Sequence, residues 1–580
     1  MSTTTISTPT VAEALAAGLA RHHVTEIFGQ SLPSALFLAT PAHGIRQVAY
    51  RTENAGGTMA DGYARISRRI GVVAAQNGPA ATLLVPPLAE AMKVSIPILA
   101  LVQDVPLANR DRNAFQEFDH VTLFASVAKW VRRLDDPSRV DEYLDMAISA
   151  ACSGRPGPTV LLLPRDLLGA PVVPSAVPRR AALGTFPQDR TRPPAEQVER
   201  AAELLRSATH PIIIAGGGVH LSGASDAVAA LQERASLPVA TTTMGKGSVD
   251  ETHPLSLGIV SNYMGQGSSS RHLREFVRDA DVVLLVGTRT NENGTDAWRA
   301  YPPEATFIHI DVDGLEVGRN YESLRLVGDA RLTLEDLLDA LESGDLTDRA
   351  AARTGFIARI DAALRQGADE LKRLASSDAA PVRPERIVAE LDNLTRDQNV
   401  IVTTDASYST IWMGNQMRSR HPGQRFLAPR GLAGLGWGVP LALGAQVADP
   451  AARVVALVGD GGFGHVWSEL ETAVRENLPV VVILLNNGIL GFQKHVELVQ
   501  LGAHTTATDF NPVDHAAIAR ACGAEAVQVT EAAEVAPALA EALQSGRPYL
   551  VEVICDPYAF PPITAWDGSH HAITGTGQSA

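Results

Sequence analysis

Short runs of β-branched and aliphatic residues alternate along this chain with longer amphipathic stretches that are rich in alanine and leucine. The short runs are typical of strands buried on both faces, and the amphipathic stretches are typical of helices that cover a sheet. Their alternation predicts an α/β fold of doubly wound parallel sheets. The clearest strand-like runs are EIFG, GVVAAQ, PILALV, PTVLLLP, PIIIAGG, LPVATT, DVVLLVG, ATFIHIDVD, NVIVTTD, RVVALVGD, PVVVILLNN and PYLVEVIC.

The strand-like runs form three groups, which predicts three α/β domains at 1–185, 194–345 and 380–557. Proline- and arginine-rich sequence separates the first two groups, and a polar helical stretch precedes the third. The first and third groups share a layout, which suggests two related domains flanking a central one. The tail, 558–580, has no strand or helix period and is interpreted as a disordered segment or as a lid-like flap over a site.

Composition narrows the possible functions. The chain has 580 residues, 45% of them hydrophobic, and a formal net charge of −15 without a long basic run, which argues against nucleic acid as a partner. No signal peptide and no 18-residue apolar run is found, so we expect a cytoplasmic protein with a small-molecule substrate and no membrane partner. Three widely separated cysteines, Cys152, Cys522 and Cys555, fit buried thiols rather than a disulfide framework.

The most informative stretch runs from GDG to NN, residues 459–487. Each end follows a buried strand, and ligands of parallel sheets bind beyond the carboxyl ends of strands. Glycines there admit a phosphate, which a helix predicted to start near Trp467 would also face. Asp460, the Asn487 amide and the Ile489 carbonyl offer the hard oxygen ligands that Mg²⁺ prefers. Taken singly, GDG is an ordinary turn and NN an ordinary corner.

The GDG to NN stretch resembles the thiamine diphosphate-binding motif of thiamine-dependent enzymes. The resemblance implies thiamine diphosphate and Mg²⁺ as cofactors. It also implies that the metal is held by Asp460, Asn487 and Ile489, and that the diphosphate lies against the glycines, which are Gly459, Gly461 and Gly462.

Other segments resemble the same family. RTENAGGTMADGYAR (51–65) looks like its glutamate segment, which implies that Glu53 activates the cofactor's pyrimidine ring; a surface glutamate is the alternative. In that family the glutamate reaches across a subunit interface, which implies a homodimer at least, and a tetramer is expected. RGLAGLGWGVPLALGAQVA (430–448) resembles the segment that holds the two rings in a V, with Leu435 as the wedge. TTDASYSTIW resembles a diphosphate-contacting loop, with Ala406, Ser407, Tyr408 and Ser409 as the contacts.

Three glutamines are candidates for the substrate and cofactor site. NAFQE resembles the glutamine-bearing loop of the acetolactate synthase branch and implies that Gln116 faces the reacting carbons. FGQSLPSALF implies a substrate-facing Gln30, and AAQNGPAATLL implies that Gln76 and Asn77 lie near the thiazolium ring of the cofactor. Each is alternatively a loop amide bonded to the backbone.

The whole pattern looks closest to actinobacterial 2-hydroxyacyl-CoA lyases, which cleave a short 2-hydroxyacyl-CoA, such as 2-hydroxyisobutyryl-CoA, to formyl-CoA and a ketone or aldehyde. The resemblance implies an acyl-CoA substrate, with Val127 and Phe492 limiting the acyl group. That family carries a proton-transferring glutamate where this chain has Gln493, and an amide cannot relay a proton. His495 and Glu497 are candidates to replace it, or are exposed residues of a charged helix.

Several alternatives stay open from the sequence. An acetolactate synthase-like or benzaldehyde lyase-like carboligase is the runner-up, and a non-enzymatic cofactor-binding subunit is a third reading. IIIAGGG in the central region is a weak dinucleotide signal, so an ADP or coenzyme A moiety, FAD, or no ligand at all fits that domain.

Overall fold

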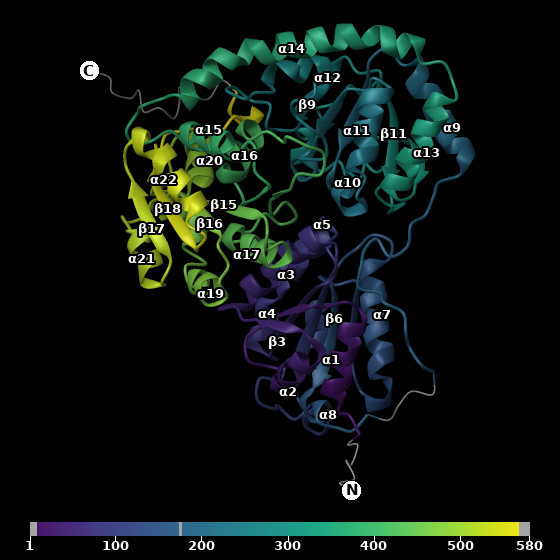
Figure 1. Cartoon of the computed structure of the whole chain (residues 1–580), viewed down its shortest axis with the longest axis vertical. Helices are drawn as coiled ribbons and strands as arrows, with labels where there is room; N and C mark the ends of the chain where they lie inside the picture. The colour runs from purple at the N-terminus through teal and green to yellow at the C-terminus, as the bar shows by residue number, and fades with distance from the viewer. Residues whose placement is uncertain (1–7, 173–176, 568–580) are drawn as a thin grey trace. The chain divides into compact units, whose positions relative to one another are not determined.

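The computed structural model describes residues 8–172 and 177–567, and within them the chain builds three six-stranded sheets in which every pairing between strands is parallel (Figure 1). The prediction of three doubly wound α/β sheets is confirmed. By its contacts the chain forms two compact units. The first contains the chain up to Asp189 with Pro429–Ala451 and Ser468–Leu478, and the second contains Arg190–Ala428, Ala452–Trp467 and the chain from Pro479.

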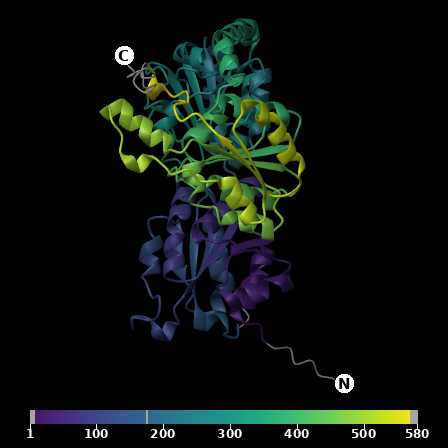
Figure 2. The same ribbon diagram turned by 90° about the vertical axis from the view of Figure 1, so that its left-hand side faces the viewer.

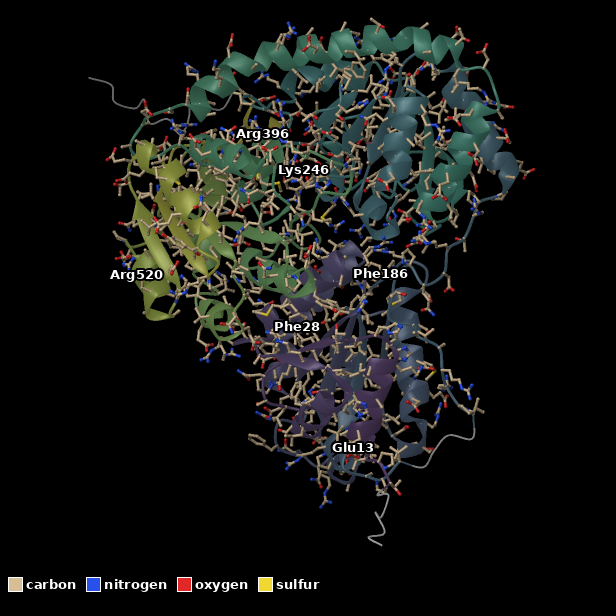
Figure 3. All side chains as sticks on the ribbon, in the orientation of Figure 1. Glu13, Phe28, Phe186, Lys246, Arg396 and Arg520 are labelled. Atoms are coloured by element: carbon tan, nitrogen blue, oxygen red, sulfur yellow. The ribbon has the colours of Figure 1, made fainter. Side chains whose placement is uncertain are left out.

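The first unit contains the first sheet, in the order β2-β1-β3-β4-β6-β5. Its aliphatic strands are buried on both faces, and Phe28, labelled in Figure 3, is fully buried in β1 with its ring edge-on to Tyr63 of α3. The strands are β1 Glu26–Gly29, β2 Arg46–Val48, β3 Gly71–Ala75, β4 Ile98–Asp104, β5 Trp130–Arg133 and β6 Thr159–Pro164.

Helices cover both faces of this sheet, with α1 against α7 in one group and α3 against α5 in the other (Figures 1 and 2). The helices of the first region are α1 Val11–Arg21, α2 Ser34–Ala39, α3 Glu53–Ser67, α4 Pro79–Leu83, α5 Val85–Val94, α6 His120–Phe124, α7 Val140–Cys152 and α8 Arg165–Leu168.

Helix α17 (Gly438–Ala448) belongs to the first unit because it packs against α3. The two backbones touch at two glycines. A Cβ at Gly62 would lie 2.3 Å from the Leu441 carbonyl oxygen, and one at Gly444 would lie 1.9 Å from that of Met59. The glycines of two segments quoted above, 51–65 and 430–448, therefore bring those segments together.

The central sheet, in the second unit, has the order β12-β11-β10-β7-β8-β9, which is the strand order of dinucleotide-binding folds. Its strands are β7 Pro211–Ala215, β8 Val239–Thr241, β9 Ser256–Ile259, β10 Val282–Val286, β11 Thr306–Asp311 and β12 Ser323–Val327. Its helices are α9 Ala195–Ser207, α10 Gly217–Ser222, α11 Ser225–Arg234, α12 Arg274–Arg278 and α13 Ala330–Glu342, and α14 Thr347–Ala375 leads to the third region.

The third sheet has the order β14-β13-β15-β16-β18-β17, which repeats that of the first sheet strand for strand and bears out their shared layout. Its strands are β13 Val400–Thr404, β14 Phe426–Leu427, β15 Arg453–Gly459, β16 Val481–Asn486, β17 Glu525–Val529 and β18 Tyr549–Ile554. The remaining helices are α15 Pro384–Thr395, α16 Tyr408–Gln416, α18 Asp460–Phe463, α19 Glu469–Arg475, α20 Gly491–Leu501, α21 His515–Ala521 and α22 Ala532–Gln544.

The tail is described as far as residue 567, and this part is packed. Phe560 and Trp566 are buried, and Asp567 forms an ion pair of 2.9 Å with Arg274 of the central region. Residues 568–580 lie outside the described part, so the interpretation of 558–580 as a disordered segment or a lid-like flap stays a prediction.

Two further expectations bear on the whole chain. Among the described residues, no helix combines the length and apolar character that a membrane crossing requires. Among the described residues, the three cysteines form no disulfide; Cys152 and Cys555 are buried, and Cys522 is half-buried.

Candidate functional site

The two ends of the GDG to NN stretch meet at one edge of the third sheet. β15 and β16 are neighbours, with Gly459 opposite Leu485, so the loops that follow them start side by side. The Gly488 N–H donates to Asp460 Oδ2 at 2.9 Å, and the Ile489 N–H donates to Asn487 Oδ1 at 3.3 Å. The structure thus places Asp460 against the loop that carries Asn487 and Ile489.

This arrangement suits a hard divalent cation. Burial raises the pKa of Asp460 to about 6, and backbone N–H groups, first that of Gly461, offset part of this effect. A buried carboxylate gains stability when a cation takes up its charge. The Ile489 carbonyl accepts no hydrogen bond from a main-chain N–H group of the described residues. A carboxylate, an amide oxygen and this carbonyl match the oxygen ligands of Mg²⁺.

Gly461 and Gly459, both at this edge of the sheet, have different structural explanations. A Cβ at Gly461 would come within 2.8 Å of Leu490 Cδ2, so this glycine allows close packing of the two loops. A Cβ at Gly459 would meet open space, which leaves room beside the backbone. The helix predicted near Trp467 begins two residues later, at Glu469. A short helix that was not predicted, α18, lies between β15 and this helix and begins at Asp460 itself.

The raised pKa of Asp460 makes a prediction about the protein without metal. An acid whose folded pKa exceeds its unfolded value of 3.8 stabilises the fold less as pH rises through the folded pKa, here about 6. We expect Asp460→Asn to relieve this cost, so its stability relative to wild type should rise by about 1.4 kcal/mol between about pH 5 and about pH 8. Urea unfolding at both pH values measures the change.

The exposed residue Asp397 supplies the matched control, since Asp397→Asn makes the same chemical change just before β13. A difference between Asp460→Asn and wild type that stays constant across this pH range contradicts the burial argument.

The loop after β13, the neighbour of β15, is the predicted diphosphate loop. Ser407 has φ +75°, a left-handed conformation that is costly outside glycine, and it turns the chain from β13 into α16. Asp405 Oδ1 accepts the Ala406 N–H at 2.9 Å, and the Ser409 hydroxyl donates to the Asp405 carbonyl. Strain concentrated in a short loop at a strand end is typical of functional sites.

Helix α20 follows the NN corner and carries the predicted substrate residues. Phe492 and Gln493 are exposed, and Gln493 Nε2 donates to Glu497 Oε1 at 3.0 Å. The Thr505 N–H donates to Glu497 Oε2, and these hydrogen bonds, first that from Gln493, lower the pKa of Glu497. Glu497 is therefore an ionised acceptor, which disfavours it as a replacement proton donor.

His495 is buried, so the interpretation of it as an exposed helix residue is wrong. Its Nε2 lies 3.1 Å from the Pro557 carbonyl, which can only accept, so Nε2 carries the proton. Nδ1 is then an acceptor for the Tyr408 hydroxyl at 2.6 Å. Burial lowers the pKa of His495 to about 4, and the ring stacks on Phe560 at 4.2 Å between centroids. A neutral ring with both nitrogens engaged holds α20, the tail and Tyr408 together, which argues against proton transfer by His495.

In the first unit Glu53 is the first residue of α3 and directly follows the N-cap residue Thr52. The fully buried Glu469 of α19 accepts the Arg51 and Thr52 N–H groups at 3.0 to 3.2 Å. Glu476, at the other end of α19, accepts the Ala49 N–H at 3.3 Å. Two carboxylates therefore fix the backbone that leads to Glu53. Sequence reasoning missed Glu469, because an acid in the first turn of a short charged helix carries no distinctive pattern.

Gln76 and Gln116 are brought together at the carboxyl edge of the first sheet. Gln76 Nε2 donates to Gln116 Oε1 at 2.7 Å, and the buried Asn77 donates to the Gln116 carbonyl at 3.0 Å. The next N–H, of Gly78, donates to Nε2 of the buried His120. His120 was also missed, because a lone histidine before an apolar run carries no distinctive pattern.

The remaining candidates of the first unit are less engaged. Gln30 is exposed, and its Nε2 contacts the Arg51 carbonyl at 3.4 Å. Val127 is buried beyond α6, and Leu435 is half-buried in the segment before α17.

The glycine run of the central region has a packing explanation. A Cβ at Gly216 would lie 2.4 Å from the Gly287 carbonyl oxygen, and one at Gly218 would lie 2.7 Å from Gly287 Cα. The loops after β7 and β10 therefore touch through their backbones at the point where the strand order reverses. The run is explained without a bound nucleotide.

Comparison with known proteins gives this geometry a context. Three family descriptions match the chain in order: the thiamine pyrophosphate enzyme N-terminal TPP binding domain at 9–123, the central domain at 198–337, and the C-terminal TPP binding domain at 405–553. A probable acetolactate synthase large subunit of Methanocaldococcus jannaschii is 33% identical, over 94% of this chain and 92% of its own. The acetolactate synthase isozyme 3 large subunit of Escherichia coli is 29% identical, over 92% of both chains. The chloroplastic acetolactate synthase of Arabidopsis thaliana is 31% identical, over 89% of this chain and 76% of its own. The chain belongs to the thiamine pyrophosphate enzyme family.

Proposed function

We propose that this enzyme joins two carbonyl compounds through a new carbon–carbon bond, as an acetolactate synthase-like carboligase that acts on 2-keto acids. The support is a family of relatives that are named acetolactate synthases, together with the Asp460, Asn487 and Ile489 oxygen donors at the edge of the third sheet. Among the sequence interpretations, this runner-up has more support than carbon–carbon cleavage of a 2-hydroxyacyl-CoA.

Thiamine diphosphate, when bound, supplies a carbanion that adds to a carbonyl group and an electron sink for the adjacent carbon. In the proposal Asp460, Asn487 and Ile489 hold Mg²⁺. The backbone at Gly459, Gly461 and Gly462 and the loop residues Ala406, Ser407, Tyr408 and Ser409 contact the diphosphate. Fixed N–H groups suit this role because they need no reorganisation when the anion binds.

Glu53 is proposed to donate its proton to the pyrimidine ring, and Leu435 to act as the wedge between the two rings. Gln116 is proposed to face the reacting carbons and Gln30 to face the substrate. Gln76, joined to Gln116 by a hydrogen bond, is proposed to lie near the thiazolium ring of the cofactor. Val127 and Phe492 are proposed to limit the acyl group. Active subunits are proposed to pair into a homodimer or homotetramer, with domains at 1–185, 194–345 and 380–557.

Cleavage of a 2-hydroxyacyl-CoA to formyl-CoA and a ketone or aldehyde is the second candidate. The packed residues Phe560 and Trp566 favour it, because they hold the tail against His495 and Phe492 of α20, the helix that carries Gln493. In this reading the central domain would take the ADP portion of coenzyme A, whereas a carboligase could hold FAD there or no ligand.

Purified protein supplied with thiamine diphosphate and Mg²⁺ should be assayed on pyruvate and separately on 2-hydroxyisobutyryl-CoA. Acetolactate from pyruvate is the expected result. Formyl-CoA without acetolactate would overturn carboligation in favour of the second candidate, and no product from either substrate would contradict both.

Gln493→Glu separates the two candidates further. If the chain is a lyase that lacks its proton relay, a carboxylate at this position should raise the rate of formyl-CoA release by roughly 100-fold. In a carboligase the change should alter acetolactate formation by less than about tenfold, because no proton relay is restored. Gln500→Glu, at an exposed position of the same helix, controls for added charge.

A further inference from the structure

We propose that His120, held by Asp104, is a positioning residue that orients Gln116 toward the substrate through the loop 76–78. The inference rests on the proposed function, since it takes Gln116 as a substrate-facing residue. Neither His120 nor Asp104 carries a role in the function proposed above, yet both are almost fully buried in the first unit.

Hydrogen-bond chemistry fixes the state of the His120 ring. The Gly78 N–H can only donate, so Nε2, 2.9 Å away, accepts with its lone pair. Nδ1 therefore carries the proton and donates to Asp104 Oδ1 at 3.1 Å. Arg133 Nε lies 2.6 Å from Asp104 Oδ2 and balances the buried carboxylate. A protonated ring would lose the Gly78 hydrogen bond, so the contact exists only with neutral His120.

The Asp104 carboxyl group stays ionised, as this arrangement needs. Burial alone would raise the pKa of Asp104, but hydrogen bonds from His120 and Arg133 outweigh it and hold the pKa below its usual value. Asp104 is the last residue of β4, which lies beside β3 in the sheet. A rigid strand end thus supports the ring, and the ring supports the loop that follows β3.

The loop that His120 holds reaches Gln116 on both sides. Gly78 has φ +66°, and a Cβ there would lie 2.8 Å from Gln116 Cβ. Gln116 itself has φ +59°, an unfavourable conformation for a residue with a side chain. Asn77 holds its carbonyl and Gln76 holds its Oε1. Strained backbone persists only where its surroundings fix it, and the anchor at Gly78 is the buried end of this set of contacts.

The same contacts determine which hydrogen-bonding groups the Gln116 side chain keeps available. Its Oε1 is occupied by the Gln76 amide, so the side chain presents its two N–H donors rather than its oxygen. Donors of this kind stabilise an oxygen that gains negative charge during the reaction. The orientation of Gln116 therefore matters more for turnover than for substrate affinity.

Two substitutions of His120 distinguish the roles of its two ring nitrogens. Glutamine extends an oxygen to the position of Nε2 and can still accept the Gly78 N–H, whereas asparagine reaches only the position of Nδ1 and leaves Gly78 without an acceptor. Both variants are made in the full chain, loaded with thiamine diphosphate and Mg²⁺. Hydrogen exchange of the Gly78 amide is measured with kcat and KM on whichever substrate the wild type turns over.

For His120→Asn we expect faster exchange at Gly78 and a kcat that falls roughly 10- to 100-fold, with KM within about twofold of wild type. His120→Gln should keep slow exchange and most of kcat. The inference is overturned if His120→Asn exchanges fast and retains kcat, or if both variants lose kcat equally.

If His120→Asn does not fold, Gln76→Ala tests the next step of the same path, since it removes the hydrogen bond to Gln116 at a half-buried loop position. An unchanged kcat in that variant also overturns the inference. Failure of the proposed function is distinct, because then the wild type itself turns over neither substrate while the exchange of Gly78 still reports on the contact.

Discussion

Replacing Glu53 with glutamine is expected to lower turnover by about 10³-fold while leaving the affinity for thiamine diphosphate within about threefold of wild type. The substitution keeps the shape of the side chain and removes only the acid that would donate a proton to the pyrimidine ring. Steady-state rates on the substrate of the wild type, with cofactor affinity from quenching of tryptophan fluorescence, measure both effects.

Glu13→Gln is the matched control. Glu13, labelled in Figure 3, also lies in the first turn of a helix, and its capping hydrogen bonds with Thr10 are of a kind that glutamine can replace. We expect wild-type turnover in this variant. Full activity in Glu53→Gln would remove Glu53 from the mechanism and favour a role in structure alone.

Replacing Asp460 with alanine is expected to weaken binding of thiamine diphosphate with Mg²⁺ by roughly 100-fold, about 2.7 kcal/mol. The change removes the only carboxylate of the proposed donor set, and an amide and a carbonyl alone bind a hard cation weakly. Titration calorimetry with the cofactor in saturating Mg²⁺ gives the affinity.

The exposed residue Asp397 again provides the comparison, since Asp397→Ala should bind the cofactor as wild type does. Circular dichroism establishes that both variants are folded. Unchanged affinity in Asp460→Ala would mean that the cation is held elsewhere, and the assignment of Asn487 and Ile489 would fall with it.

The central strands of each sheet could be predicted from the sequence because they are continuous aliphatic runs buried on both faces, such as VVILLN in β16. The edge strands could not. RQV in β2 has one buried residue in three, and the two residues of β14 are too few to show a period. Their pairing is decided by the neighbouring strand rather than by their own pattern.

The candidate site also combines residues that could be predicted from the sequence with residues that could not. Asp460 and Asn487 stand at strand ends, where local sequence determines position, so their meeting could be predicted. Burial could not, because it depends on elements far away in the chain: His495 is covered by Phe560, and Glu469 by the segment around Arg51. The roles of both residues emerge only from those distant contacts.

Helix α19 limits how the chain can be altered. Its residues lie between GDG and NN, and Glu469 and Glu476 hold the backbone at 49–52. An insertion or deletion in this interval would shift the register of those carboxylates even if both ends of the motif were preserved. Length in this interval should therefore be intolerant of change, and affinity tags or reporter peptides are better placed in the exposed turn at 502–504.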